Sequence, residues 1–137
     1  MAEAQRTLES LCIACPRGCR LRAAVASDGT CRIEGARCKL GREYGRQEAL
    51  SPRRVLTTTL ATAWGRPVPA RSSRPIERGL LLDVQRRLAD VVLDTPVHAG
   101  DTLASNIDGQ GADLVATADG PVPPSPAHED VGRSMDC

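Results

Sequence analysis

The chain has 137 residues and a formal net charge of +1, with 18 basic side chains against 17 acidic ones. This length suits one domain, or two small lobes that share a core. Phenylalanine is absent, and Tyr44 and Trp64 are the only large rings. The core must therefore rely on aliphatic side chains, and a metal crosslink would stabilise it further. The lack of stacking rings and the near-neutral charge argue against nucleic-acid binding.

The N-terminus and the cysteine content together indicate a reducing compartment. The first ten residues include Glu3 and Glu9 and contain no apolar run, which argues against a secretory signal. No apolar stretch approaches the roughly 18 residues that are needed to cross a bilayer. We therefore expect a cytoplasmic protein with reduced thiols. In that setting, six cysteines favour metal ligation or redox chemistry over a disulfide framework.

The first half of the chain predicts a hairpin and a helix around the cysteines. Apolar and polar residues alternate after Cys19, and Ser-Asp-Gly-Thr at 27–30 is a hairpin signal. Pro52 would end the helix. The expected elements are a strand over 7–11, a cysteine knuckle over 12–19, strands over 20–26 and 31–34, and a helix over 40–50.

The second half predicts a small sheet and one main helix. Leu81, Val84 and Leu88 recur at helical spacing, which places the helix over 76–89. Strands are expected over 55–62, 68–71, 91–93, 101–104 and 114–117. The predicted fold class is α+β, with the knuckle and hairpin followed by a small mixed sheet that the helix covers. The expected domains are a cysteine-rich metal- or cluster-binding segment (1–50), a small α+β lobe (51–119) and a disordered Pro-rich tail (120–137).

The cysteine spacing indicates a metal centre. Cys12, Cys15 and Cys19 follow a CxxCxxxC pattern, and Cys31 and Cys38 come later. Three close thiols with one distant thiol are typical of a [4Fe–4S] cluster. Structural zinc sites more often pair two CxxC knuckles, so zinc is the alternative. Radical enzymes that use S-adenosylmethionine have the reverse spacing, and a thioredoxin-type pair would need a βαβ setting that is missing here.

The fourth ligand could be Cys31 or Cys38. Cys31 precedes Ile33 in an alternating strand, where a small buried side chain is expected. Cys38 follows Gly35 just before a helix, which favours it as the ligand. Arginines and one lysine surround the cysteines and could offset the charge of a four-thiolate site, although they could also form a simple solvated surface. They are Arg17, Arg20, Arg22, Arg32, Arg37, Lys39 and Arg42.

Three segments resemble a family of small uncharacterised bacterial proteins with conserved CxxC-type cysteines, a domain of unknown function. They are CIACPRGCRLRAAV, CKLGREYGRQE and SPRRVLTTTL, and the similarity continues to Gly120. The family cysteines match Cys12, Cys15, Cys19 and Cys38, while Cys31 stands where the family has an aliphatic residue. The family resemblance also implies flavoprotein partners, one similar to glycerol-3-phosphate dehydrogenase and one to NAD(P)-linked flavin oxidoreductases.

Residues 12–41 also resemble the N-terminal [4Fe–4S] segment of molybdopterin oxidoreductases, in which Lys39 would match the basic residue beside the cluster. The chain is too short for the molybdopterin domains. Together these observations predict an iron–sulfur protein that carries electrons as an accessory subunit of a flavin-dependent dehydrogenase complex. The alternatives are a zinc-binding interaction module without a redox role and a thiol–disulfide protein. No catalytic residue is expected, because no Ser/His/Asp or Cys/His grouping emerges.

Overall fold

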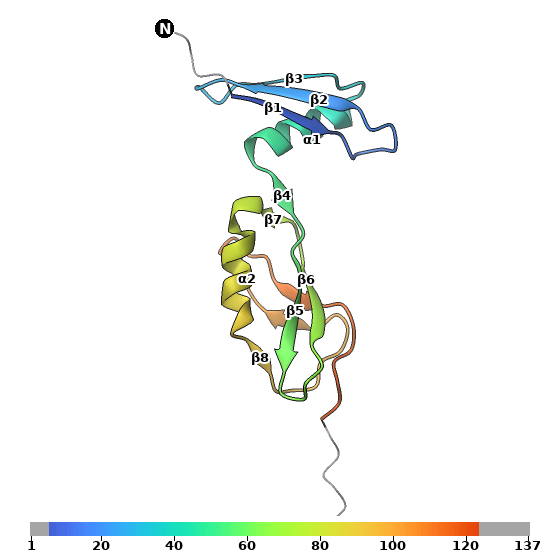
Figure 1. Ribbon diagram of the computed structural model, residues 1–137, viewed down its shortest axis with the longest axis vertical. Coiled ribbons are helices and arrows are strands. Elements are labelled where there is room, and N and C mark those ends of the chain that lie inside the picture. The colour runs from blue at the N-terminus through green and yellow to red at the C-terminus, as the bar shows by residue number, and fades with distance from the viewer. Residues whose placement is uncertain (1–5, 124–137) are drawn as a thin grey trace, which may run out of the picture. The chain divides into compact units, whose positions relative to one another are not determined.

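The computed structural model describes residues 6–123, which form two compact units (Figure 1). The first unit contains the chain up to residue 56 together with residues 74–82. The second contains residues 57–73 and the chain from residue 83 onward. Both units combine helix and strand, which confirms the α+β class. Most of the expected Pro-rich tail, residues 124–137, and Cys137 with it, lie outside the described residues.

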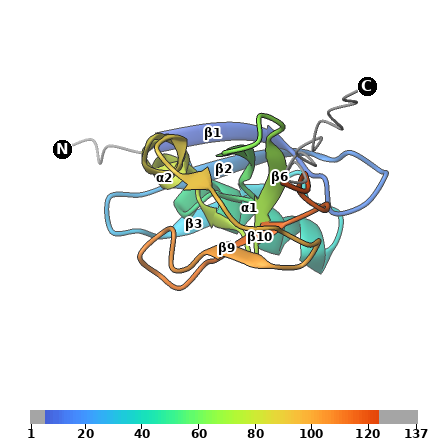
Figure 2. The ribbon, with the colours of Figure 1, turned by 90° about the horizontal axis from the view of Figure 1, so that it is seen from below.

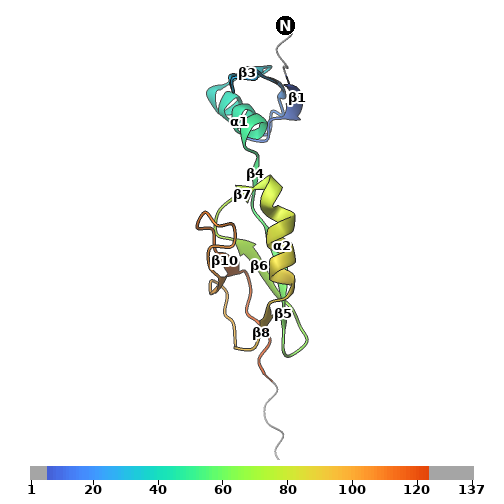
Figure 3. The same ribbon diagram turned by 90° about the vertical axis from the view of Figure 1, so that its left-hand side faces the viewer.

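The first unit contains a three-stranded antiparallel sheet with one helix on its face (Figures 1 and 3). The sheet order is β1-β2-β3, and helix α1 follows β3 in the chain. A short pair, β4 with β7, completes this unit. The bounds are β1 Arg6–Leu11, β2 Arg20–Val25, β3 Cys31–Glu34, α1 Lys39–Leu50, β4 Arg53–Arg54 and β7 Ile76–Glu77.

Small residues on α1 allow it to approach the sheet closely. Gly41, Gly45 and Ala49 are buried and recur every four residues, so they lie on one face of the helix. A Cβ atom added at Gly45 would lie 3.1 Å from methyl groups of both Leu21 and Ile33. The helix backbone thus packs directly on aliphatic side chains of β2 and β3. This close packing supplies a core in a unit without phenylalanine or tryptophan.

The second unit is built on a five-stranded mixed sheet. Its order is β8-β5-β6-β10-β9, in which β5 and β8 pair in parallel and the other pairs are antiparallel. Figure 2 shows β10 between β6 and β9. Val68, Val97 and Ala116 form a buried cluster in this unit. The bounds are β5 Thr57–Thr62, β6 Val68–Ser72, β8 Val92–Leu93, β9 Thr102–Ala104 and β10 Leu114–Ala116.

The main helix begins later than the sequence predicted. Helix α2 spans Leu81–Ala89 and follows a single 3₁₀ turn, η1 (Arg78–Leu80). The prediction of helix from residue 76 was wrong because Ile76 and Glu77 form β7, with Ile76 fully buried opposite Arg54. A β-branched residue just after a proline favours this extended conformation, and tertiary pairing outweighed the helical periodicity. The other expected elements agree with the structure to within two residues.

Two glycines with the same backbone conformation provide a matched test of the first unit. Gly35 and Gly29 have φ values of 83° and 84°, yet a Cβ atom at Gly35 would lie 2.1 Å from the carbonyl oxygen of Arg20, while Gly29 is open. We expect Gly29→Ala to lower the free energy of unfolding by about 1 kcal/mol, from φ strain alone. Gly35→Ala should cost about 4 kcal/mol, because a backbone clash is added. Urea unfolding measures both, and equal losses would contradict the assigned contact.

The ion pair between α1 and β4 predicts a pH dependence. Two hydrogen bonds from the Arg54 guanidinium, one of them 2.9 Å long, hold the pKa of Glu48 below its ordinary value of 4.5. The pair therefore stabilises the fold above that pH, and its contribution disappears as the pH falls through the lower folded-state pKa. Glu48→Gln should cost about 1 kcal/mol near neutral pH, with the deficit closing in acid.

Glu9→Gln is the matched control for this variant. Glu9 pairs with Arg22 at 2.9 Å, but these side chains are 72% and 61% exposed, whereas that of Glu48 is only 19% exposed. An exposed pair contributes little, so this variant should stay within about 0.5 kcal/mol of the wild type. A penalty for Glu48→Gln that does not change with pH would refute the electrostatic origin.

Candidate metal centre

The cysteine knuckle is a closed loop between β1 and β2. The backbone N–H of Cys12 donates a 2.8 Å hydrogen bond to the carbonyl oxygen of Cys19, next to the last pair of the β1–β2 ladder. Gly18 has a φ of 62°, a conformation in which glycine is favoured. Cys12 is buried at the base of the loop, Cys19 is half-buried and Cys15 is exposed. The loop therefore has a fixed base, with Cys15 between its two ends.

Cys38 caps the N-terminus of α1. Its backbone is extended (φ −149°, ψ 169°), and its sulfur accepts a 3.3 Å hydrogen bond from the N–H of Gly41. Because unpaired N–H groups and the helix dipole favour negative charge at this end, the position suits a thiolate or an anionic cluster. The side chain remains exposed, so it is open to a ligand.

The sulfurs of Cys12 and Cys38 both lie beside Gly41. A Cβ atom at Gly41 would lie 3.7 Å from each sulfur, so the two sulfurs are separated by at most twice that distance. Two segments that are distant in sequence, the knuckle and the helix cap, thus bring their thiols together. Sequence reasoning assigned no role to Gly41. The Cys-x-x-Gly spacing at a predicted helix start was the available signal, since it places the glycine one turn above the capping side chain.

The other cysteines do not complete this pair in the structure. Within residues 6–123, no three His, Cys, Asp or Glu side chains are close enough together to hold a metal ion. Cys31 lies on β3 opposite Val25 and is half-buried. It lines a hollow with Lys39, Arg42 and other α1 residues, but nothing groups it with the pair at Gly41. The four-cysteine site and its metal therefore stay predictions.

Part of the predicted ligand set fits a metal centre. Cys12 and Cys38 already converge, and soft thiolate donors select zinc or iron–sulfur clusters. Cys15 and Cys19 would have to join them through closure of residues 13–18. Most of these residues are exposed, so their movement would disturb little core packing.

The chain belongs to a family that is described as a protein of unknown function, DUF1667, whose profile matches residues 39–118. The match begins directly after Cys38, so it covers none of the four predicted ligands. An NMR structure of a Clostridium perfringens protein from a structural-genomics programme is similar, with a TM-score of 0.48 and 22% identity. That similarity covers 56% of this chain and 93% of the other one. The curated proteins contain no match.

Within residues 6–123, no helix combines the length and the apolar character that crossing a bilayer needs.

The helix cap predicts a stability difference between two Cys38 variants. In metal-free protein, Cys38→Ala should cost about 1 kcal/mol, because the Gly41 N–H loses its acceptor. Cys38→Ser should stay close to the wild type, because a hydroxyl oxygen can also accept this hydrogen bond. Thermal unfolding in the presence of a chelator measures both variants. If the serine variant is as unstable as the alanine variant, the sulfur does not act as a cap.

Proposed function

We propose that this protein binds one [4Fe–4S] cluster and carries electrons as an accessory subunit of a flavin-dependent dehydrogenase complex in the cytoplasm. Cys12, Cys15, Cys19 and Cys38 are the proposed ligands. The observation that carries the proposal is that the Cys12 and Cys38 sulfurs both lie beside Gly41. A knuckle of three cysteines with a distant fourth cysteine is a common arrangement of cubane ligands.

The local electrostatics support an anionic centre at this position. The N-terminus of α1 contributes partial positive charge next to Cys38, and Lys39 and Arg42 lie on its first turn. An oxidised cubane with four thiolates is dianionic, so these charges would stabilise it. When bound, such a cluster supplies one-electron transfer, and the chain's own groups tune its potential through hydrogen bonds, charge and solvent exposure.

The proposed flavoprotein partners and accessory role rest on the resemblance to the small bacterial family with CxxC-type cysteines. The resemblance of residues 12–41 to the cluster-binding segment of molybdopterin oxidoreductases supports cluster binding alone, and in it Lys39 matches the basic residue beside the cluster. The side chain of Lys39 is 84% exposed, so it can face a partner. Its Nζ atom lies 3.8 Å from Oε1 of Glu43. Catalysis by the chain alone is not part of the proposal.

Zinc is the second candidate, without a redox role. A structural zinc ion takes the same thiolate ligands and supplies folding free energy when it binds. A first unit with few large side chains would gain from such a crosslink. The zinc-bound form would act as an interaction module.

Metal and sulfide analysis of anaerobically purified protein distinguishes the two candidates. We expect brown protein that contains iron and acid-labile sulfide in equal amounts and bleaches with dithionite. Serine variants of each of the four proposed ligands should lose most of the iron. Cys31→Ser, the matched control, should retain it. Colourless protein with one bound zinc ion per chain would contradict the cluster and support zinc. Loss of iron from the Cys31→Ser control would contradict the assignment of Cys38 as the fourth ligand in place of Cys31.

A further inference from the structure

A hollow beside Cys19 is surrounded by positive charge. It is lined by Arg17, Arg20 and Arg37 together with Cys19, and no carboxylate contributes to the lining. We call the three arginines and this hollow the arginine hollow. All of its residues belong to the first unit. The three arginines are exposed, while Cys19, which lines the same hollow, is half-buried.

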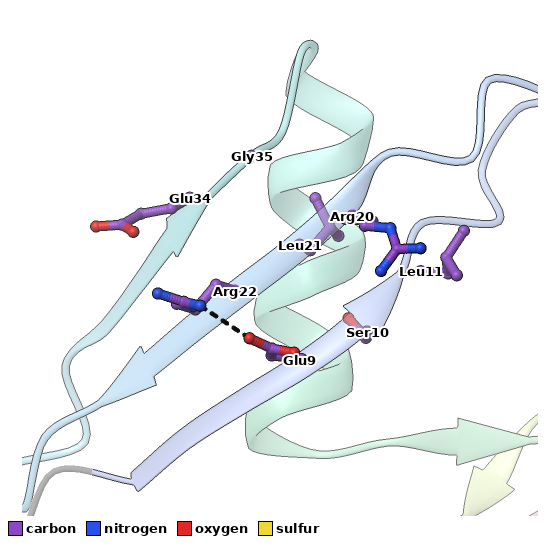
Figure 4. Close-up of a pocket in the computed structure, with 8 residues that line it drawn as sticks. All are labelled: Glu9, Ser10, Leu11, Arg20, Leu21, Arg22, Glu34 and Gly35. Atoms are coloured by element: carbon purple, nitrogen blue, oxygen red, sulfur yellow. Dashed lines mark hydrogen bonds and ion pairs between the residues drawn. The ribbon is translucent and has the colours of Figure 1, made fainter.

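The charges of the arginine hollow are not neutralised within the part of the chain that the structure describes. No carboxylate there forms an ion pair with any of its three guanidinium groups. Arg20 also lines a neighbouring hollow (Figure 4). In that neighbouring hollow, Arg22 forms an ion pair with Glu9. Glu34 on β3 is the remaining carboxylate of that neighbouring hollow. The three guanidinium groups of the arginine hollow thus face solvent, and Glu34 lines only the neighbouring hollow that shares Arg20.

The exposure of the arginines indicates the kind of occupant. A tight site for a small anion holds its charged groups buried and preorganised, whereas these side chains stay hydrated. Exposed charges act weakly one by one but together steer the approach of a large, oppositely charged surface. Leu11, which is 55% exposed at the edge of the neighbouring hollow, adds an apolar contact. The arrangement therefore fits a protein surface better than a free anion.

We propose that the arginine hollow is the docking site for the carboxylate-rich face of an electron-transfer partner protein. This inference rests on the proposed function, because Cys19 is one of the four proposed ligands. As a ligand, its half-buried side chain would place one edge of the proposed cluster next to the docked partner protein. Small, charged and rapidly exchanging interfaces are typical of redox partners, since electrostatic complementarity raises the rate of encounter.

Binding of flavodoxin, a small acidic flavoprotein, provides a probe of this surface. Its dissociation constant is measured by calorimetry at low ionic strength with anaerobically purified full-length protein. The triple variant R17Q/R20Q/R37Q should bind about tenfold more weakly than the wild type. The matched control R32Q/R46Q/R78Q removes the same charge from exposed positions of the same unit outside the arginine hollow, and should change binding by less than about threefold. Glu34→Gln should strengthen binding.

Three outcomes would overturn the docking site: unchanged binding by the first triple variant, equal weakening by both triple variants, or displacement of flavodoxin by phosphate at constant ionic strength. The last outcome would make a small anion the occupant. Iron and sulfide are measured on the same samples. Arginine-dependent binding by protein without a cluster would refute the proposed function and retain the docking site. If protein that contains the cluster binds flavodoxin independently of the three arginines, the docking site is refuted and the proposed function is retained.

Discussion

The close approach of α1 to the β1-β2-β3 sheet is the constraint on which the candidate site depends. Glycine at positions 41 and 45 and alanine at 49 remove the side chains that would otherwise hold the helix away. At Gly45 the helix rests on Leu21 and Ile33, and one turn earlier, at Gly41, the same face meets the sulfurs of Cys12 and Cys38. A larger residue at Gly41 would occupy the space beside both sulfurs. The packing of the core and the convergence of the thiols therefore have the same cause.

Electrostatic features of the first unit also suit negative charge near the cysteines. The N-terminus of α1 favours negative charge at Cys38, and Cys19 lines a hollow with three arginines that form no ion pair within residues 6–123. Exposed arginines with no carboxylate partner do little for stability, because their charge is screened by water. The proposed anionic centre and the proposed acidic partner surface would each give them a role.

Membership of a family of unknown function leaves the cysteines as the main chemical evidence. The family match covers α1 to β10 and begins next to Cys38, so the knuckle precedes the matched region. Helix α1 connects the two, because its buried face lies on the sheet while its N-terminal cap is Cys38, whose sulfur lies beside Gly41 as that of Cys12 does. The region matched to the family thus includes the helix that positions the predicted fourth ligand.

Local patterns in the sequence were sufficient for most elements of the fold. Alternation predicted β2 and β3, the Ser-Asp-Gly-Thr turn joined them, and Pro52 marked the end of α1, because these signals depend on neighbouring residues only. The start of α2 could not be predicted in this way, since Ile76 pairs with Arg54, which is more than twenty positions away. The sequence also singled out Cys38 over Cys31, from its place before a helix. Only the tertiary structure decided that the sulfurs of Cys12 and Cys38 both lie beside Gly41, because this proximity depends on how closely a helix can approach a sheet, which no local pattern encodes.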